Sequence, residues 1–155
     1  MAELNPNQNI IFNLEKIYIK DISYEAPGVP LAFTQQDAAA EIGVQLGIEH
    51  TTLNAEQGLY ELTLSVTASA KRETKNIFLV EVKQAGVFRI QGMNSLMLQR
   101  TLEINCATVL LPFVREAVNE IVGKGGFPQL LINPVNFESL YEQKQAAQAN
   151  KPSLN

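Results

Sequence analysis

The chain has 155 residues, the length of one ordinary domain, and 46% of them are apolar while only 18% are charged. A chain of this length can bury a substantial core, and the low share of charged residues leaves apolar surface for partners. Its longest apolar runs fall far short of the ~20 residues of a membrane-spanning helix, so we expect no direct insertion into a bilayer.

The charge is distributed unevenly. Residues 1–62 carry nine acids and two bases, whereas residues 63–155 carry seven acids and ten bases, and the net charge is −4. An acidic first half disfavours nucleic acid as a partner and favours a basic protein, although an acidic surface kept for solubility explains it equally well. No basic segment followed by an apolar stretch opens the chain, so we expect a cytoplasmic protein.

The first predicted strand lies near the N-terminus, and its alternation slips once. Phe12 and Leu14 share one parity, whereas Ile17 and Ile19 share the other. One extra residue in a strand turns every following side chain to the opposite face. We therefore expect a bulge or bend at residues 15–16.

The middle of the chain predicts three further strands. Apolar residues alternate with polar ones over 42–48 and 60–69, and the turn-forming stretch 54–58 between them indicates an antiparallel hairpin. A polar link over 71–76 then leads into residues 77–84, which are rich in strand formers and apolar on both parities at first.

A long helix is predicted next. Residues 96–122 carry apolar side chains at helical spacing, with Phe113 and Val114 among those on the packed side, and Gly123 follows. Pro112 lies inside this segment, where it removes an amide donor and clashes with the preceding turn. We expect the helix to kink at Pro112 or to begin a new segment there.

A shorter helix follows, with Asn136 as its cap. Four strands followed by two helices indicate an α+β fold. We expect a four-stranded antiparallel sheet with a long kinked helix and a shorter C-terminal helix packed on one face. The predicted organisation is a flexible N-terminus over residues 1–9, a single domain over 10–145 and a flexible tail over 146–155.

Catalytic residue types are too few for an obvious active site. His50 is the only histidine and Cys106 the only cysteine, so neither a nucleophile with its base nor a metal-ligand set is visible. The glycines of 123–126 follow a helix instead of opening one, which is typical of a helix stop. Glu116 and Glu120 fit a solvated helix stripe. We expect no enzyme activity, no cofactor and no metal.

Several stretches resemble, in order and with matching spacing, the SecB family of bacterial export chaperones. The resemblance runs from about residue 10 to 145. The stretches that carry it are 17–30, 78–82, 86–88, 110–116 and 126–130 followed by 134–137.

The resemblance implies a homotetramer built as a dimer of dimers, without a cofactor. It also implies an ATP-independent holdase, which binds unfolded precursor polypeptides, keeps them competent for translocation and delivers them to the motor ATPase SecA. ATP would be hydrolysed by SecA.

The resemblance also implies three sets of site residues. The groove for client polypeptides would have Ile42, Val44 and Leu46 on one wall and Phe137, Leu140 and Tyr141 on the other. SecA would dock on Asp21, Glu25, Leu79 and Glu81, and Val80, Val82 and Gln84 on the opposite parity would support tetramer assembly. Ordinary core is the alternative for the groove residues, because an alternating strand and an i, i+3, i+4 cluster need burial anyway.

The sequence departs from the family pattern at two places. No tryptophan follows Phe33, where residues 35–38 read Gln-Gln-Asp-Ala, and the tail from 150 has no acidic run. Three alternatives to the export function remain. They are a chaperone of the same fold dedicated to one client such as an antitoxin, an adaptor oligomer without chaperone activity, and an enzyme with an unrecognised site.

Overall fold

The computed structural model describes residues 9–35 and 39–150. Residues 1–8 and 151–155 lie outside the described residues, and with them most of the predicted flexible ends. The loop residues 36–38 lie outside them too. Nine elements follow one another: β1 (Ile11–Glu25), η1 (Leu31–Thr34), β2 (Glu41–Asn54), β3 (Leu59–Arg72), β4 (Lys75–Gln91), α1 (Ser95–Arg100), η2 (Thr101–Cys106), α2 (Ala107–Lys124) and α3 (Phe137–Ala149).

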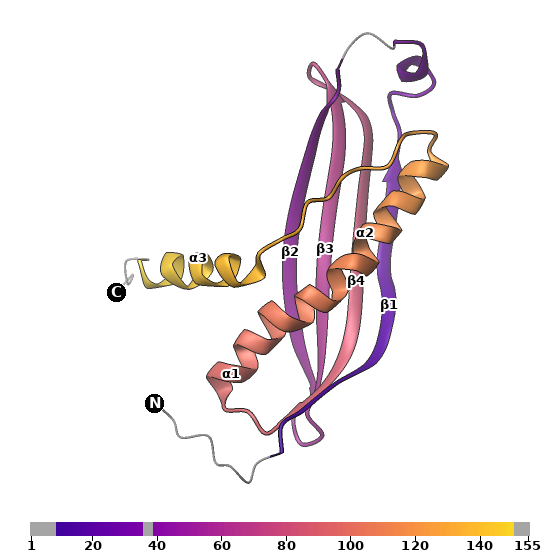
Figure 1. The fold of residues 1–155 in the computed structure, drawn as a ribbon. Coiled ribbons are helices and arrows are strands. Elements are labelled where there is room, and N and C mark those ends of the chain that lie inside the picture. The colour runs from indigo at the N-terminus through magenta and orange to yellow at the C-terminus, as the bar shows by residue number, and fades with distance from the viewer. Residues whose placement is uncertain (1–8, 36–38, 151–155) are drawn as a thin grey trace.

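The four strands form one antiparallel sheet in the order β1-β4-β3-β2, and the helices lie on one side of it (Figure 1). This arrangement confirms the predicted α+β fold. The predicted hairpin is β2 with β3, in which Leu46 lies opposite Val66. Its turn is closed by Asn54, whose Oδ1 accepts from the Gln57 amide at 3.0 Å, and by Gly58, whose φ of 68° favours glycine.

Strand β1 contains two register shifts. One lies between Leu14 and Lys16, as the sequence predicted, and a second lies between Ile19 and Asp21. Each shift reverses the parity, so β1 keeps its apolar residues on the helix side along its whole length. These residues pair with helix-side positions of β4; they are Phe12, Leu14, Ile17, Ile19, Ile22 and Tyr24.

The polar link predicted over 71–76 is wrong. Lys71 pairs with Asn76 and Arg72 pairs with Lys75, so β3 and β4 continue almost to a tight turn. Glu73 in that turn has a φ of 57°. Polar side chains fit this end of the sheet because they reach water while their backbone groups stay paired.

The long helix runs from α1 through η2 to α2 without leaving the helical path (Figure 1). Asn94 caps it, because its Oδ1 accepts from the Met97 amide at 2.8 Å. No new segment begins at Pro112, which lies inside α2. Regular α-helical geometry is interrupted earlier, at η2, which is π-helical.

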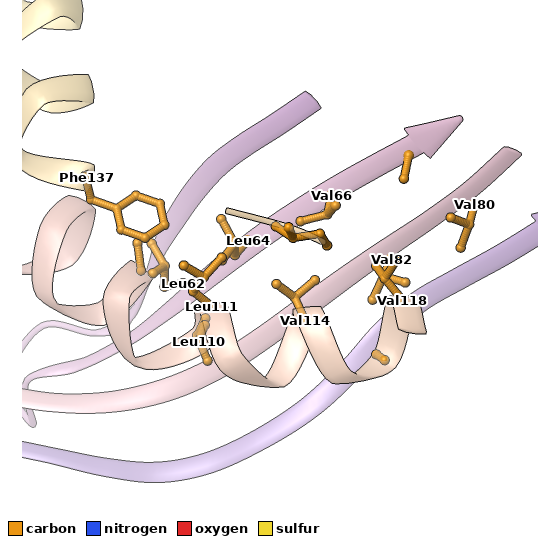
Figure 2. Close-up of a cluster of buried hydrophobic side chains, with 14 of the residues drawn as sticks. Leu62, Leu64, Val66, Val80, Val82, Leu110, Leu111, Val114, Val118 and Phe137 are labelled. Atoms are coloured by element: carbon orange, nitrogen blue, oxygen red, sulfur yellow. The ribbon is translucent and has the colours of Figure 1, made fainter. Parts of the chain in front are cut away.

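The core lies between the long helix and the helix side of β3 and β4 (Figure 2). Burying one such side chain completely stabilises the fold by about 1.5–3 kcal/mol. Phe113 does not belong to this core, because it is 42% exposed while Leu110 is fully buried. The fully buried residues that face one another are Leu62, Leu64, Val66, Val80, Val82, Leu110, Val114 and Val118.

Helix α3 begins at the predicted cap, where Asn136 Oδ1 accepts from the Ser139 amide at 3.1 Å. The linker before it crosses the helix side of the sheet towards β2, and α3 then projects away from the sheet (Figure 1). It continues to Ala149, beyond the domain boundary expected at 145. None of the described helices is long and apolar enough to cross a bilayer.

Candidate functional site

The four residues predicted to dock SecA lie together on the outer face of the sheet, away from the helices. Glu25 on β1 lies opposite Leu79 on β4, and Asp21 lies four pairs further along the same ladder, on the same face. Glu81 shares the parity of Leu79. Leu79 is 36% exposed, and Asp21 and Glu25 are exposed as well. We call these four residues the acidic patch.

The carboxylates of the acidic patch lack ion-pair partners within residues 9–35 and 39–150. Among the described residues, none of the ion pairs involves Asp21, Glu25 or Glu81. The cation nearest in register is Lys83, opposite Asp21. The patch therefore presents carboxylates around one exposed leucine.

A neighbouring carboxylate on the same face is, by contrast, fully engaged. Glu61 accepts from Lys20 Nζ at 2.7 Å and from the Tyr18 hydroxyl. These hydrogen bonds, that of Lys20 first, lower the pKa of Glu61. Burial, followed by the bond to Glu61, raises the pKa of Tyr18 to about 12. The sequence analysis missed this cluster, which ties β1 to β3 across β4.

The predicted groove residues of β2 lie on the helix side. The long helix packs on β3 and β4 and leaves the helix side of β2 largely uncovered. Ile42 is consequently 50% exposed and Val44 40% exposed, whereas Leu46 is half-buried. Apolar side chains thus line an edge strand with little of their own chain above them.

Three cavities follow β2 from Ile42 towards Ile48. The first, of about 310 Å³, includes Ile42 and the phenylalanines 33, 78 and 127. The second, of about 380 Å³, includes Val44, Leu46 and the linker over 131–136. The third, of about 300 Å³, includes Leu46, Ile48 and Tyr141. We call this row the β2 groove.

The three α3 residues reach the groove to different degrees. Leu140 lines both the second and the third cavity and is 39% exposed. Phe137 and Tyr141 line the third cavity from largely buried positions. The structure therefore brings Leu46 of β2 and Leu140 of α3 to the same cavities, while Ile42 lies with the aromatic cluster instead.

Sequence reasoning missed part of the first cavity. Phe127 stacks near Phe33, with ring centroids 5.1 Å apart, and near Phe78 at 4.9 Å. Phe33 is 44% exposed. Residues 126–130 were singled out only because they resemble the family pattern. The available sequence signal was an aromatic residue between a glycine and a proline directly after a helix, which suggests a loop of fixed conformation.

Val80, Val82 and Gln84 lie beneath the long helix, where they are 0–3% exposed. Gln84 Nε2 donates to the Tyr18 carbonyl at 3.0 Å. These residues offer no surface to a second copy, so any effect on assembly would act through the position of β4. Their part in tetramer assembly stays a prediction.

The residues with catalytic potential are scattered. His50 is exposed on β2, and Cys106 is fully buried, which raises the pKa of its thiol to about 12. Within 9–35 and 39–150, no three histidine, cysteine, aspartate or glutamate side chains gather as a metal site would require.

Helix α3 is attached to the long helix by charged contacts that the sequence analysis did not foresee. Arg100 contacts Glu138 at 3.2 Å and lies over the Tyr141 ring, 5.2 Å from its centroid. Lys144 Nζ contacts Oε1 of the buried Glu103 at 2.8 Å. These contacts fix the wall of the third cavity, and no periodicity links residues so distant in the chain.

A family model and the sequences of related proteins both identify the same family. The family described as "Preprotein translocase subunit SecB" matches residues 5–148. A "Protein-export protein SecB" of Acidithiobacillus ferrooxidans is 43% identical over 92% of this chain and 95% of its own length. One of Azoarcus sp. is 46% identical over 93% of this chain and 94% of its own length.

A solved structure shares the fold. It is a SecB-like chaperone of Mycobacterium tuberculosis in complex with a ChAD peptide from the HigA1 antitoxin. The TM-score is 0.67 at 12% identity, over 80% of this chain and 90% of that one. At this identity the likeness concerns the fold alone.

Proposed function

The chain belongs to the SecB family, and from this premise we propose that it is an ATP-independent holdase of the cytoplasm. In this role it binds unfolded precursor polypeptides, keeps them competent for translocation and delivers them to SecA. No cofactor takes part, and ATP is hydrolysed by SecA.

The observation that carries the holdase role is the β2 groove. An unfolded client exposes apolar segments in an extended chain, and a row of apolar cavities along an edge strand suits such a chain without requiring one sequence. Contacts at successive cavities combine through effective concentration, so weak contacts give a high overall affinity. A folded protein has already buried these segments, so the groove favours slowly folding precursors.

Delivery is supported by the acidic patch on the other face of the sheet. Unpaired carboxylates around an exposed leucine suit a basic partner surface with an apolar centre. Because the patch and the groove lie on opposite faces, SecA and a client can be bound together. We assign Asp21, Glu25, Leu79 and Glu81 to this contact.

A homotetramer, built as a dimer of dimers, extends the client track. Apolar residues that the single chain leaves exposed support assembly, since large apolar patches in folded proteins mark interfaces. On β1 these are Phe12 at 37%, Leu14 at 41% and Ile19 at 47% exposure, and on α2 Phe113 at 42%.

A dedicated antitoxin chaperone is the main alternative. The two export-named relatives given above are 43% and 46% identical to this chain, whereas the antitoxin-bound structure is 12% identical. We therefore prefer a general export role. Holding of several unrelated unfolded proteins is expected, and holding of only one would favour the dedicated role.

The deciding experiment combines aggregation and mass. The chain should suppress aggregation of an unfolded precursor diluted from denaturant, without ATP, and should have a native mass of four chains of 17.1 kDa. The mass should rise further when the unfolded precursor is added. A stable monomer that leaves aggregation unchanged would refute the proposal.

A further inference from the structure

A buried carboxylate lies beside the third cavity of the β2 groove, and the proposed function gives it no role. Glu103 belongs to the π-helical segment η2 and is 4% exposed. It lines a cavity whose other walls are mainly apolar. They are Leu46, Ile48, Phe137, Leu140, Tyr141 and the stem of Lys144.

The two oxygens of Glu103 differ in their partners. Oε1 accepts from Lys144 Nζ at 2.8 Å, whereas Oε2 is buried and receives no hydrogen bond from any described protein group. A buried carboxylate oxygen without a donor is unfavourable, because it has lost its hydration without replacement. A donor entering the cavity would relieve this cost. The terminal torsion of glutamate is soft, so the carboxylate can turn Oε2 towards the donor, and the Lys144 side chain, which is 52% exposed, can follow Oε1.

The charge at this position selects the kind of donor. Lys144 already neutralises Glu103, so a second cation would leave an unpaired charge in an apolar cavity. A neutral N–H or O–H donor adds no charge. The depth of Oε2 further requires that the donor be carried at the tip of a side chain.

The apolar walls determine the rest of that side chain. A large apolar body that ends in a neutral donor is found in tyrosine and tryptophan. Phenylalanine fills similar space but leaves Oε2 without a partner. A site with a buried acceptor discriminates against an analogue that lacks the donor.

We propose that the third cavity is a client subsite for a tyrosine or tryptophan side chain, which donates its O–H or N–H to Oε2 of Glu103. The inference rests on the proposed function, because the client supplies the side chain. It adds a specificity-determining residue that discriminates among apolar segments of a client.

Two peptide series identical except at one position test the proposal. The first places phenylalanine, tyrosine or lysine there, and the second tryptophan or 1-methyltryptophan, which keeps the indole but lacks its donor. Because this chain contains no tryptophan, the emission of a tryptophan peptide reports only on the peptide. The unmodified chain should bind the tyrosine and tryptophan peptides about tenfold more tightly than their matched partners.

The variant Glu103→Leu should bind each matched pair about equally, with the phenylalanine peptide held as well as before. Leucine suits the buried position, and Lys144, whose side chain is 52% exposed, can turn to water. Glu120→Leu, which removes a surface carboxylate paired with Lys124, should keep the tenfold preference.

Two results would overturn the subsite. One is equal binding of tyrosine and phenylalanine peptides by the unmodified chain, and the other is a preference that persists in Glu103→Leu. Tightest binding of the lysine peptide would also contradict it. If no peptide bound at all and aggregation were unaffected, the holdase function itself would fail, which separates that failure from the failure of the subsite.

Discussion

The carboxylates on the outer face of the sheet differ in whether they form an ion pair with another side chain of the described chain. Glu61 is held by Lys20 and Tyr18, whereas Asp21 and Glu81 form none of the ion pairs found in the described part of the chain. We therefore expect the first carboxylate to contribute to stability, and we propose that the other two act in recognition. The next two predictions test this division.

Charge reversal in the acidic patch should separate the two proposed activities. Asp21→Lys combined with Glu81→Lys should weaken SecA binding at least about tenfold, since like charges then meet across the contact. Stimulation of the SecA ATPase should fall accordingly, while suppression of client aggregation is retained. Both activities are measured on the same preparations.

The matched control is Glu49→Lys, because Glu49 lies on the same face but on β2, the opposite edge strand. It should leave both activities close to those of the unmodified chain. Equal loss of aggregation suppression and ATPase stimulation in the double variant would contradict separate sites.

Replacing the engaged carboxylate should instead change stability. Glu61→Gln should lower the free energy of unfolding at neutral pH by about 1–2 kcal/mol, the size of a charge-assisted hydrogen bond. The folded state lowers the pKa of Glu61 from 4.5, so its contribution is present above that value and is lost as the pH falls through the folded pKa.

Urea unfolding of both chains across the acid range measures this difference, which should shrink below pH 4.5. Glu49→Gln, at an exposed position, should change stability by less than about 0.5 kcal/mol at any pH. A difference between Glu61→Gln and the unmodified chain that grows on acidification would refute the assignment.

At the scale of the elements, glycine is needed in the hairpin turn but is an unfavourable residue in the long helix. Gly58 has a φ of 68°, and a Cβ there would lie 2.4 Å from the Ile90 carbonyl oxygen. Gly123 lies in α2, where a Cβ would meet nothing within 4 Å. The same substitution should therefore have opposite effects at the two positions.

Gly58→Ala should lower the free energy of unfolding by about 1–3 kcal/mol, through strain and the close contact. Gly123→Ala should raise it by about 0.5–1 kcal/mol, because alanine is the better helix former. Equilibrium unfolding in urea checks both. If both substitutions changed the free energy of unfolding in the same direction, the local backbone geometry at these glycines would not determine their contribution to stability.

Strand positions were predictable wherever alternation was regular. The bulge before Lys16 followed from parity alone, and the β2–β3 hairpin from alternation together with the turn-forming stretch 54–58. The second bulge was also visible, because Ile19 and Ile22 lie on different parities, but the sequence analysis did not use it. The polar end of the β3–β4 hairpin was missed because polar side chains do not distinguish a strand from a loop where the strand projects into solvent.

The long helix and the groove depended more on tertiary packing. Of the two alternatives expected at Pro112, a new segment is not found, because Pro112 lies inside α2. The π-helix η2 was missed, because nothing in the spacing of 101–106 indicates it. The pairing of Glu103 with Lys144 joins residues 41 apart, which no local pattern encodes. The groove residues were identified through family resemblance, and their binding role stays a prediction.

At the scale of the whole molecule, the sheet separates two surfaces. The helix side carries the β2 groove, and the outer face carries the acidic patch. Val80 and Val82 lie between them, buried under the long helix. Any influence of these valines on assembly must therefore pass through the fold of the single chain.

Val82→Ala tests this dependence. It should lower the free energy of unfolding by about 1–3 kcal/mol, since it opens a cavity beneath α2. If it also weakens the tetramer, the loss of mass and the loss of stability should appear together. Native mass and urea unfolding at one fixed protein concentration measure both. Dissociation with unchanged stability would instead indicate that Val82 contacts another copy directly.

The two bulges of β1 also determine which changes of chain length the protein tolerates. Substitutions along the outer face leave Asp21, Ser23 and Glu25 pointing outward. Deletion of Lys20, the extra residue at the second register shift, would leave Ile19 opposite Gln84 and Asp21 opposite Lys83, so these three residues would still point outward. Deletion of Ser23, which is paired with Glu81, would instead turn Glu25 to the helix side and Tyr24 to the outside. In β1, insertions or deletions at paired positions should therefore be far more damaging than exchanges, or than the loss of the extra residue at a register shift.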